Sequence, residues 1–405
     1  MNRSSIFKIK IDFERSQGSY LFDKNTGKQY LDFFGQYATL ALGYNHPVFQ
    51  LEEYQSEVKR VSHQKITNCE MLADETAEFD QVFRDYTSGG VFTHYHYTCT
   101  GALAIEAAIK AAMDYKGLNH LRVISFKGSF HGINSYGGIV TDRFEPVSQR
   151  LKGFPGQYWA PLGNPIIEYE DDEAIIDEEK VNNVLSQIED IIVRDRNVCS
   201  ILVEPIQCTY GDCYFPESFF LGVRKLADRY DIPLIFDEIQ VGFGGTGKVW
   251  YFQHLPIVPD IVVFGKKTQL SGIMVQKKFA KIFQKSIRLE VTWDADLMDM
   301  VRCKYVINAY QKYNILDNVR LMSGRLVSGL KGIDGLLNIR NAGLLVAFDF
   351  EEKAQRDSFM KSLVNNDMIC NPTRDYTIRL RPNLCVTSSE VDHALEIMTN
   401  AAKCL

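Results

Sequence analysis

The chain has 405 residues, of which 45% are hydrophobic and 24% are charged, and its formal net charge is -6. This length exceeds what one hydrophobic core usually supports, so we expect a large domain and a smaller lobe. The acidic balance argues against nucleic-acid partners. No apolar run approaches the roughly twenty residues that cross a bilayer, so we also expect no membrane partner and a cytoplasmic protein.

Residues 21–32 form the first predicted element, because the turn signal Lys-Asn-Thr-Gly lies there between strand-like flanks. This pattern is typical of a β-hairpin. We expect the hairpin to belong to an N-terminal segment, residues 1–45, that packs on the smaller lobe.

The middle of the chain alternates between helical and strand-like patterns. Residues 102–115 carry apolar side chains on a helical period, Gly117 supplies a C-terminal stop, and a strand-like run follows at 122–126. The acidic stretch 168–179 is expected to be a solvated loop and a helix start. A second unit of strand, helix and strand covers residues 201–204, 218–230 and 233–237, and the unit then repeats to Lys266.

This alternation predicts an α/β fold with a mainly parallel central sheet and helices on both faces, in a large domain covering residues 46–290. From about Asp294 the pattern changes. A long helical pattern at 297–313 precedes strand-like runs at 344–350 and 378–381. We expect residues 291–405 to form a smaller α+β lobe.

The cysteines argue against a structural metal or disulfide framework. None forms a C-x-x-C pair and their number is odd. Cys208 and Cys213 are close enough in the sequence to suggest a metal-binding or disulfide pair, but buried or idle thiols are the more common outcome. We therefore expect no metal. The nine cysteines are residues 69, 99, 199, 208, 213, 303, 370, 385 and 404.

Asp237 and Lys266 each lie at the end of a short apolar run. Two neighbouring strands that end this way present an acid and an amine to one cofactor, pyridoxal phosphate (PLP). Its aldehyde needs a lysine to form a Schiff base, and its ring nitrogen needs a carboxylate to stay protonated. Lys267 leaves the choice of lysine open from spacing alone, and a structural aspartate is the alternative for Asp237.

Thr100, Gly101 and Ala102 precede the clearest helix. Exposed amide groups and the positive end of the helix dipole make this position a candidate phosphate seat. An ordinary N-cap by Thr100 is the alternative.

Further candidates follow other strands of the same sheet. Phe130 could stack on a cofactor ring, with His131 and Gly132 beside it. Gln240 could donate to the phenolic oxygen of that ring. A loop histidine, a core phenylalanine and a solvated amide are the alternatives. Ligands of open parallel sheets bind beyond the carboxyl ends of the strands, which favours a shared site.

Together these residues resemble a fold-type I, class III PLP-dependent aminotransferase over nearly the whole chain. The most specific motif runs from Asp237 to Lys248 and is similar to the family signature D-E-x-Q-x-G-x-G-x-T-G-K, and Glu204-Pro-Ile-Gln207 is nearly as distinctive. Within the family, the segments beginning at Gly101, Phe264 and Thr292 resemble the lysine 6-aminotransferase and 4-aminobutyrate aminotransferase subgroup.

The resemblance implies roles for several residues. Lys266, the first of the lysine pair, forms the internal aldimine with PLP, and Asp237 is the second catalytic residue. Thr292 reaches the phosphate of the neighbouring subunit's cofactor, so a homodimer with shared active sites follows. Glu204 joins the cofactor-binding residues.

Two departures from the family pattern concern the substrate. Ile133 stands where the subgroup has an arginine that clamps the distant carboxylate, and Thr209 replaces a glutamate that shields the arginine matching Arg379. The loss of that glutamate leaves Arg379 open to a substrate carboxylate in both half-reactions. Plain lysine and 4-aminobutyrate are thereby disfavoured. Arg143 and Lys127 are alternative candidates for a clamp, but the sequence places neither.

The expected function is transfer of an amino group from a primary amine or amino acid to an oxo acid such as 2-oxoglutarate. An aminomutase or decarboxylase shares all these residues and stays an alternative. A non-catalytic relative is the third, disfavoured because a structural role does not require both Lys266 and Asp237.

Overall fold

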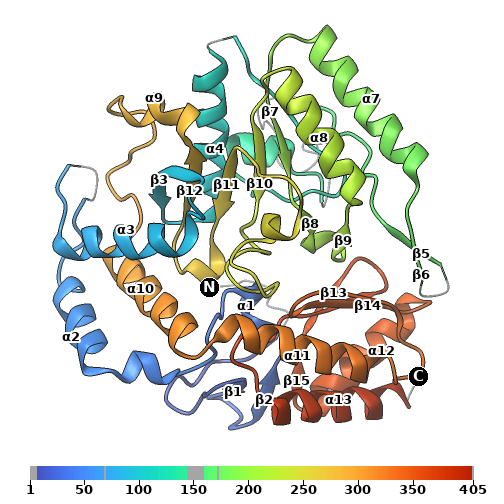
Figure 1. The fold of residues 1–405 in the computed structure, drawn as a ribbon. Coiled ribbons are helices and arrows are strands. Elements are labelled where there is room, and N and C mark those ends of the chain that lie inside the picture. Colours follow the sequence, from blue (N-terminus) through green and yellow to red (C-terminus); the bar gives the residue numbers. More distant parts are fainter. Residues whose placement is uncertain (1–6, 68–69, 118, 144–158, 171–172, 404–405) are drawn as a thin grey trace.

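The computed structural model describes residues 7–67, 70–117, 119–143, 159–170 and 173–403. Figure 1 shows a large sheet flanked by helices in the upper part of the molecule and a smaller lobe below it. Cys69 and Cys404, counted among the thiols above, lie outside the described residues.

The large sheet has six strands in the order β3-β12-β11-β10-β7-β4. The strands β4, β7, β10 and β11 pair in parallel, and β12 is antiparallel to both β11 and β3. The prediction of a mainly parallel sheet is therefore confirmed. Its strands are β3 (Phe92–Thr98), β4 (Arg122–Ile124), β7 (Val198–Val203), β10 (Leu234–Asp237), β11 (Ile261–Phe264) and β12 (Ser271–Gln276).

Both faces of this sheet are buried, which explains why its strands read as continuous apolar runs. In β10, Leu234 and Phe236 join one hydrophobic core, while Ile235 between them joins another. The core around Ile235 lies under α4 (Gly101–Lys116), and the core on the opposite face is covered by four other helices (Figure 1). These are α3 (Asp74–Thr87), α7 (Glu178–Arg194), α8 (Glu217–Arg229) and α10 (Leu297–Lys312).

The predicted helices of the large domain are confirmed to within one or two residues. The helix expected at 102–115 is α4, which ends at Gly117 with a φ of 102° that favours glycine. Shorter elements complete this part of the chain: α1 (Gly35–Ala38), η1 (Pro47–Gln50), α2 (Glu52–Val61), α5 (Ser135–Val140), η3 (Tyr251–His254), η5 (Lys277–Phe279) and α9 (Ala280–Phe283).

The smaller lobe is built on a four-stranded antiparallel sheet in the order β13-β14-β17-β16. Its strands are β13 (Leu337–Ala342), β14 (Leu345–Asp349), β16 (Asn371–Thr373) and β17 (Thr377–Leu380). Its helices are α11 (Ile315–Leu330), α12 (Lys353–Asn365) and α13 (Ser388–Ala402).

The N-terminal hairpin is present as β1 (Tyr20–Phe22) and β2 (Gln29–Asp32), with Gly27 of the predicted turn at a φ of 72°. Strand β2 pairs in parallel with β15 (Met368–Ile369), so the hairpin is joined to the C-terminal part of the chain. The boundaries expected at residues 45/46 and 290/291 stay predictions.

The expectation of a solvated loop over the acidic stretch 168–179 was wrong in part. It contains the hairpin of β5 (Glu168–Glu170) and β6 (Glu173–Ile175), although α7 does start at Glu178 as expected. The hairpin strands are largely exposed, so no apolar alternation marks them. A second short hairpin, β8 (Ile206–Gln207) with β9 (Cys213–Tyr214), encloses the turn η2 (Cys208–Tyr210).

Within the described residues, the structure has no helix long and apolar enough to cross a membrane. The same part of the chain contains no group of three or more His, Cys, Asp or Glu side chains placed to hold a metal ion. Its seven cysteines, including Cys208 and Cys213, are free thiols.

Candidate active site

Asp237 and Lys266 line one cavity of about 300 Å³. They arrive there because β10 and β11 are parallel neighbours: Asp237 is the last residue of β10, and Lys266 opens the turn η4 (Lys266–Thr268) after β11. The other lining residues also follow strand ends or begin α4. The full lining is Gly101, Ala102, Phe130, His131, Gly132, Ile133, Glu204, Ile206, Asp237, Ile239, Gln240, Val241 and Lys266.

The structure separates the two lysines that the sequence left open. Lys266 borders the cavity, whereas Lys267 is buried and its Nζ donates to the backbone carbonyls of Gln240 at 2.8 Å and Gly242 at 3.3 Å. Removal from water lowers the pKa of Lys266 to about 8, so a substantial fraction of its amine is neutral near physiological pH. A neutral amine in the cavity is the form that attacks an aldehyde.

The Asp237 carboxylate is fixed by two donors. Its Oδ2 lies 2.9 Å from Nδ1 of His131, and its Oδ1 accepts the backbone N–H of Ile239 at 3.1 Å. Asp237 is 6% exposed, and these two partners satisfy both of its buried carboxylate oxygens. His131 Nε2 is buried and has no hydrogen-bond partner among the described residues.

Glu204, which follows β7, supports the opposite wall. Its Oε1 accepts the backbone N–H of Phe130 at 2.7 Å and so holds the turn that carries Phe130 and His131. Burial, with repulsion from Asp237 as a smaller contribution, raises the pKa of Glu204 well above its usual range.

The start of α4 forms one end of the cavity. Gly101 and Ala102 line it, and Thr100 caps the helix, with its side chain accepting the N–H of Leu103 at 3.4 Å. The capping interpretation of Thr100 is thus confirmed, and its use for a phosphate stays a prediction. A Cβ on Gly101 would lie 2.8 Å from Cδ1 of Ile239, so a larger residue here would require the Ile239 side chain to shift.

Arg379 lies behind Gln240 and is not among the described residues that line the cavity. Its Nη1 donates to the carbonyl of Cys208 at 2.6 Å and to Oε1 of Gln240 at 3.3 Å. Because arginine only donates, the Gln240 amide oxygen faces Arg379, which leaves its NH₂ group for the cavity. The sequence analysis expected Arg379 to be open to a substrate carboxylate. Its charge is available for such a partner, but its side chain is only 4% exposed.

Arg379 lacks the glutamate partner that the family resemblance implies, and its hydrogen-bond acceptors are neutral. No carboxylate of the described residues lies within ion-pair distance of it, and burial lowers its pKa to about 10, with Arg381 adding to the shift. Thr209, at the glutamate's position, accepts at its backbone oxygen from Thr373 Oγ1 at 2.6 Å and from Arg143 Nε. Its own Oγ1 is buried without a hydrogen-bond partner in the described chain.

The other sequence candidates are placed as follows. Ile133 lines the cavity and is 70% exposed, so it forms an apolar rim. Thr292 is exposed and lies outside the lining of this chain's cavity. Lys127 is exposed, and its carbonyl accepts a hydrogen bond from the side-chain amide of Gln207 at 2.9 Å. Neither Lys127 nor Arg143 is among the described residues that line the cavity.

Sequence reasoning missed the apolar walls, Ile206, Ile239 and Val241. Each lies one or two residues from a motif residue that was identified, which is the signal that could have found them. It also left Glu238 of the signature without a role. That side chain is buried and accepts the backbone N–H groups of Tyr251 and Phe252 at 2.6 and 2.8 Å, so it holds the chain beyond the motif.

These residues fit PLP. Asp237 is a buried carboxylate suited to a protonated ring nitrogen, Lys266 is an amine of lowered pKa, and the start of α4 is suited to a phosphate. Gly132, at a φ of 97°, keeps its wall close to Ala102, since a Cβ there would lie 3.3 Å from that side chain.

Comparison with known proteins agrees with this site. The sequence model of the family described as "Aminotransferase class-III" matches residues 2–402. The chain is 31% identical to the L-lysine-epsilon aminotransferase of Mycobacterium tuberculosis, over 97% of this chain and 91% of that protein. It is 28% identical to the 4-aminobutyrate aminotransferase of Schizosaccharomyces pombe, over 94% and 86%.

Solved structures give the same picture. The lysine aminotransferase from M. tuberculosis in the internal aldimine form superposes with a TM-score of 0.92 at 30% identity, covering 98% of this chain and 95% of that one. A transaminase from the marine bacterium Virgibacillus, 20% identical with a TM-score of 0.85 over 98% and 93% of the two chains, shares the fold.

Proposed function

This chain belongs to the class III aminotransferase family and is a PLP-dependent aminotransferase; from that premise we propose that Lys266 and Asp237 are its catalytic residues and that 2-oxoglutarate is an amino-group acceptor. The observation that carries the assignment is the delivery of both side chains to one cavity by parallel neighbouring strands. Family membership favours transamination over the aminomutase and decarboxylase alternatives.

When bound, PLP supplies an aldehyde that accepts amines and a ring that withdraws electrons from the substrate carbon. Lys266 holds the cofactor between turnovers. When its amine is free and neutral, Lys266 would take the proton from the substrate carbon as general base. The lowered pKa of Lys266, about 8, supports this role because the base has to be unprotonated to act.

The other cavity residues hold the cofactor. Asp237 keeps the ring nitrogen protonated, and His131 orients Asp237 through the 2.9 Å hydrogen bond. Gln240 offers its NH₂ group to the phenolic oxygen, while Phe130 contributes a flat side chain to the wall. The N-terminal amides of α4, at Gly101 and Ala102 after Thr100, bind the phosphate.

The donor is an amine or amino acid related to, but distinct from, lysine and 4-aminobutyrate. Ile133 gives the cavity an apolar rim in place of a cation, which favours a donor without a distant carboxylate. Arg379, buried with neutral partners, binds the carboxylate of the acceptor once the Gln240 side chain moves. Thr209 leaves this cation uncompensated in both half-reactions.

The active enzyme is a homodimer in which Thr292 of each subunit reaches the cofactor phosphate of the other. The exposed position of Thr292 in this chain supports that role, as do apolar neighbours on the surface: Ile287, Val291 and Trp293 are 88%, 52% and 51% exposed. We place the enzyme in the cytoplasm, where the seven free thiols of the described residues stay reduced.

An amine-donor screen tests the proposal. The PLP-loaded enzyme is mixed with lysine, ornithine, 4-aminobutyrate or simple amines, first without an acceptor and then with 2-oxoglutarate or pyruvate. Loss of the yellow colour with a donor, and its return only when an oxo acid is added, is the expected result. A colour that never returns, or that returns without an oxo acid, contradicts amino transfer to these acceptors.

A further inference from the structure

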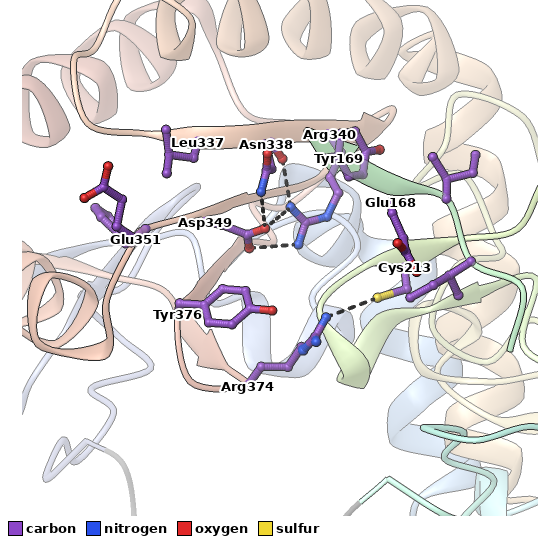
Figure 2. A pocket seen from close by; sticks show the side chains of 13 residues that line it. Glu168, Tyr169, Cys213, Leu337, Asn338, Arg340, Asp349, Glu351, Arg374 and Tyr376 are labelled. Carbon is purple, nitrogen blue, oxygen red and sulfur yellow. Dashed lines mark hydrogen bonds and ion pairs between the residues drawn. The ribbon is translucent and has the colours of Figure 1, made fainter. Parts of the chain in front are cut away.

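A second cavity, of about 460 Å³, lies where the β5 and β9 hairpins meet the sheet of the smaller lobe. Figure 2 shows its side chains converging from β5, β13, β14 and the turn before β17. It shares no described lining residue with the cofactor cavity. This space is therefore a separate site, and its volume is within the range of about 300–1,000 Å³ usual for small-molecule pockets.

Some of the charged side chains in this second cavity already have partners. Arg340 forms two hydrogen bonds with Asp349, Nη1 to Oδ2 and Nη2 to Oδ1, both at 3.0 Å. Thr377 donates to the same carboxylate at 2.6 Å. Glu168, at the rim, accepts from Lys180 Nζ at 2.6 Å. These groups hold the walls together and are not available to a ligand.

Arg374 and Glu351 are different. Both line the cavity, and neither lies within ion-pair distance of an opposite charge in the part of the chain that the structure describes. The cavity thus presents one uncompensated cation and one uncompensated anion. A ligand that matches it carries a negative and a positive group.

The Arg374 guanidinium is held in place. It lies 4.6 Å from the ring centre of Tyr210 and 5.3 Å from that of Tyr376, and its Nη1 is 3.8 Å from Cys213 Sγ. Its backbone has a φ of 52°, a left-handed conformation that is unfavourable for a residue with a side chain. Contacts with the faces of aromatic rings leave the guanidinium N–H groups, other than the Nη1 group that donates to Cys213, for a carboxylate.

Apolar surface separates the two charges. In Figure 2 the Tyr376 ring lies between Arg374 and Glu351. Leu337 and Phe350 also line the cavity. A ligand that reaches both charges therefore presents an apolar segment to these side chains.

We propose that this cavity binds a small zwitterion whose carboxylate and cationic group are separated by a short apolar chain. Arg374 binds the carboxylate through charge-assisted hydrogen bonds, and Glu351 binds the cation. The chain packs against Tyr376. This binding does not depend on the chemistry at Lys266.

Calorimetric titration of the PLP-loaded enzyme with 4-guanidinobutanoate tests the proposal. This probe carries both charges, and its guanidinium does not react with an aldehyde as a primary amine does. The expected result is one molecule bound per subunit, with no change in the visible spectrum of the cofactor. Butanoate and propylguanidinium, which carry one charge each, should bind at least tenfold more weakly.

Two variants locate the binding. Arg374→Gln and Glu351→Gln should each weaken binding of 4-guanidinobutanoate at least tenfold. Arg325→Gln is the matched control, because Arg325 is an exposed arginine of α11 that pairs with Asp392 at 2.6 Å, and it should leave the affinity unchanged. Arg379→Met should also leave it unchanged, since a loss there would place the probe in the active site and overturn the proposal.

A charge reversal keeps the test decisive if Arg374→Gln fails to fold. Glu351 is exposed, so Glu351→Lys preserves the fold, which the melting temperature checks. This variant should lose 4-guanidinobutanoate and gain glutarate, whose two carboxylates match Arg374 and the new lysine. No binding to the unmodified enzyme overturns the proposal. So does unchanged affinity in either the Glu351→Gln or the Glu351→Lys variant.

Discussion

A buried arginine beside the cofactor cavity and a buried arginine at the contact between the two lobes differ in their partners. Arg379 and Arg381 are two residues apart and are 4% and 3% exposed. Arg381 pairs with the buried carboxylate of Asp212, whereas Arg379, beside the cofactor cavity, has carbonyl and amide oxygens as its acceptors. The same side chain, equally buried, is compensated in one place and left uncompensated in the other.

The pKa shifts follow this difference. Burial lowers the pKa of Arg379 to about 10. Burial also acts to lower the pKa of Arg381, but the Asp212 carboxylate, with smaller contributions from Cys208 and Tyr214, offsets it and the pKa of Arg381 is raised. The Arg340–Asp349 pair behaves as Arg381 does. Arg381 and Arg340 are each compensated by a carboxylate of the protein, whereas Arg379 is not, and we propose that Arg379 binds a ligand that brings its own negative charge.

The largest effect is expected from Lys266→Ala. Loss of both the cofactor-binding amine and the general base should reduce turnover by about 10⁴-fold or more and abolish the visible absorbance of the bound cofactor. Lys267→Ala is the matched control. It should keep the absorbance while lowering the free energy of unfolding by about 1–3 kcal/mol, because two buried carbonyls lose their donor. The reverse pattern would show that Lys267 is the catalytic lysine.

Replacing each of the two arginines by methionine tests the comparison directly. Arg381→Met leaves Asp212 buried and unpaired, so it should lower the free energy of unfolding by about 3–5 kcal/mol. Arg379→Met leaves neutral oxygens unpaired, so it should cost about 1–3 kcal/mol and weaken the binding of 2-oxoglutarate. Urea unfolding and apparent KM values measure the two effects. Equal destabilisation by both changes would refute the distinction.

Much of the framework was predictable from the sequence. Helices α4 and α8 and strands β4, β7, β10 and β11 were predicted because apolar periodicity and strand-end carboxylates are local signals, as at Asp237. The β5–β6 hairpin was not, because its exposed charged residues carry no apolar alternation.

The partners of the arginines were beyond sequence reasoning. Arg379 donates to a backbone carbonyl, that of Cys208, and every residue offers such an acceptor. The choice between Lys266 and Lys267 likewise depends on a single backbone turn, η4, in which Lys266 has a φ of 58°. The second cavity combines residues as far apart as Glu168 and Arg374, so no local pattern announces it.

The pH dependence of cofactor uptake should show the lowered pKa of Lys266. Only the neutral amine attacks the aldehyde, so the rate at which cofactor-free enzyme binds PLP should rise about tenfold from pH 7 to pH 9 and level off above the pKa of about 8. A lysine of ordinary pKa gives a steeper rise, without a plateau in this range. Stopped-flow absorbance measures the rate. A rise that continues tenfold per pH unit beyond pH 8.5 would contradict the assignment.

The smallest effect is expected from Thr209→Glu, which gives Arg379 the kind of partner that Arg381 already has. Position 209 follows Cys208, whose carbonyl accepts from Arg379, so a glutamate there is placed to compete with a substrate carboxylate for the guanidinium. An ion pair worth about 1 kcal/mol raises the apparent KM for 2-oxoglutarate about fivefold. Thr209→Gln has the same size without the charge and should leave that KM nearly unchanged. If both variants raise it equally, bulk rather than charge controls access to Arg379, and the uncompensated arginine is not what selects the acceptor.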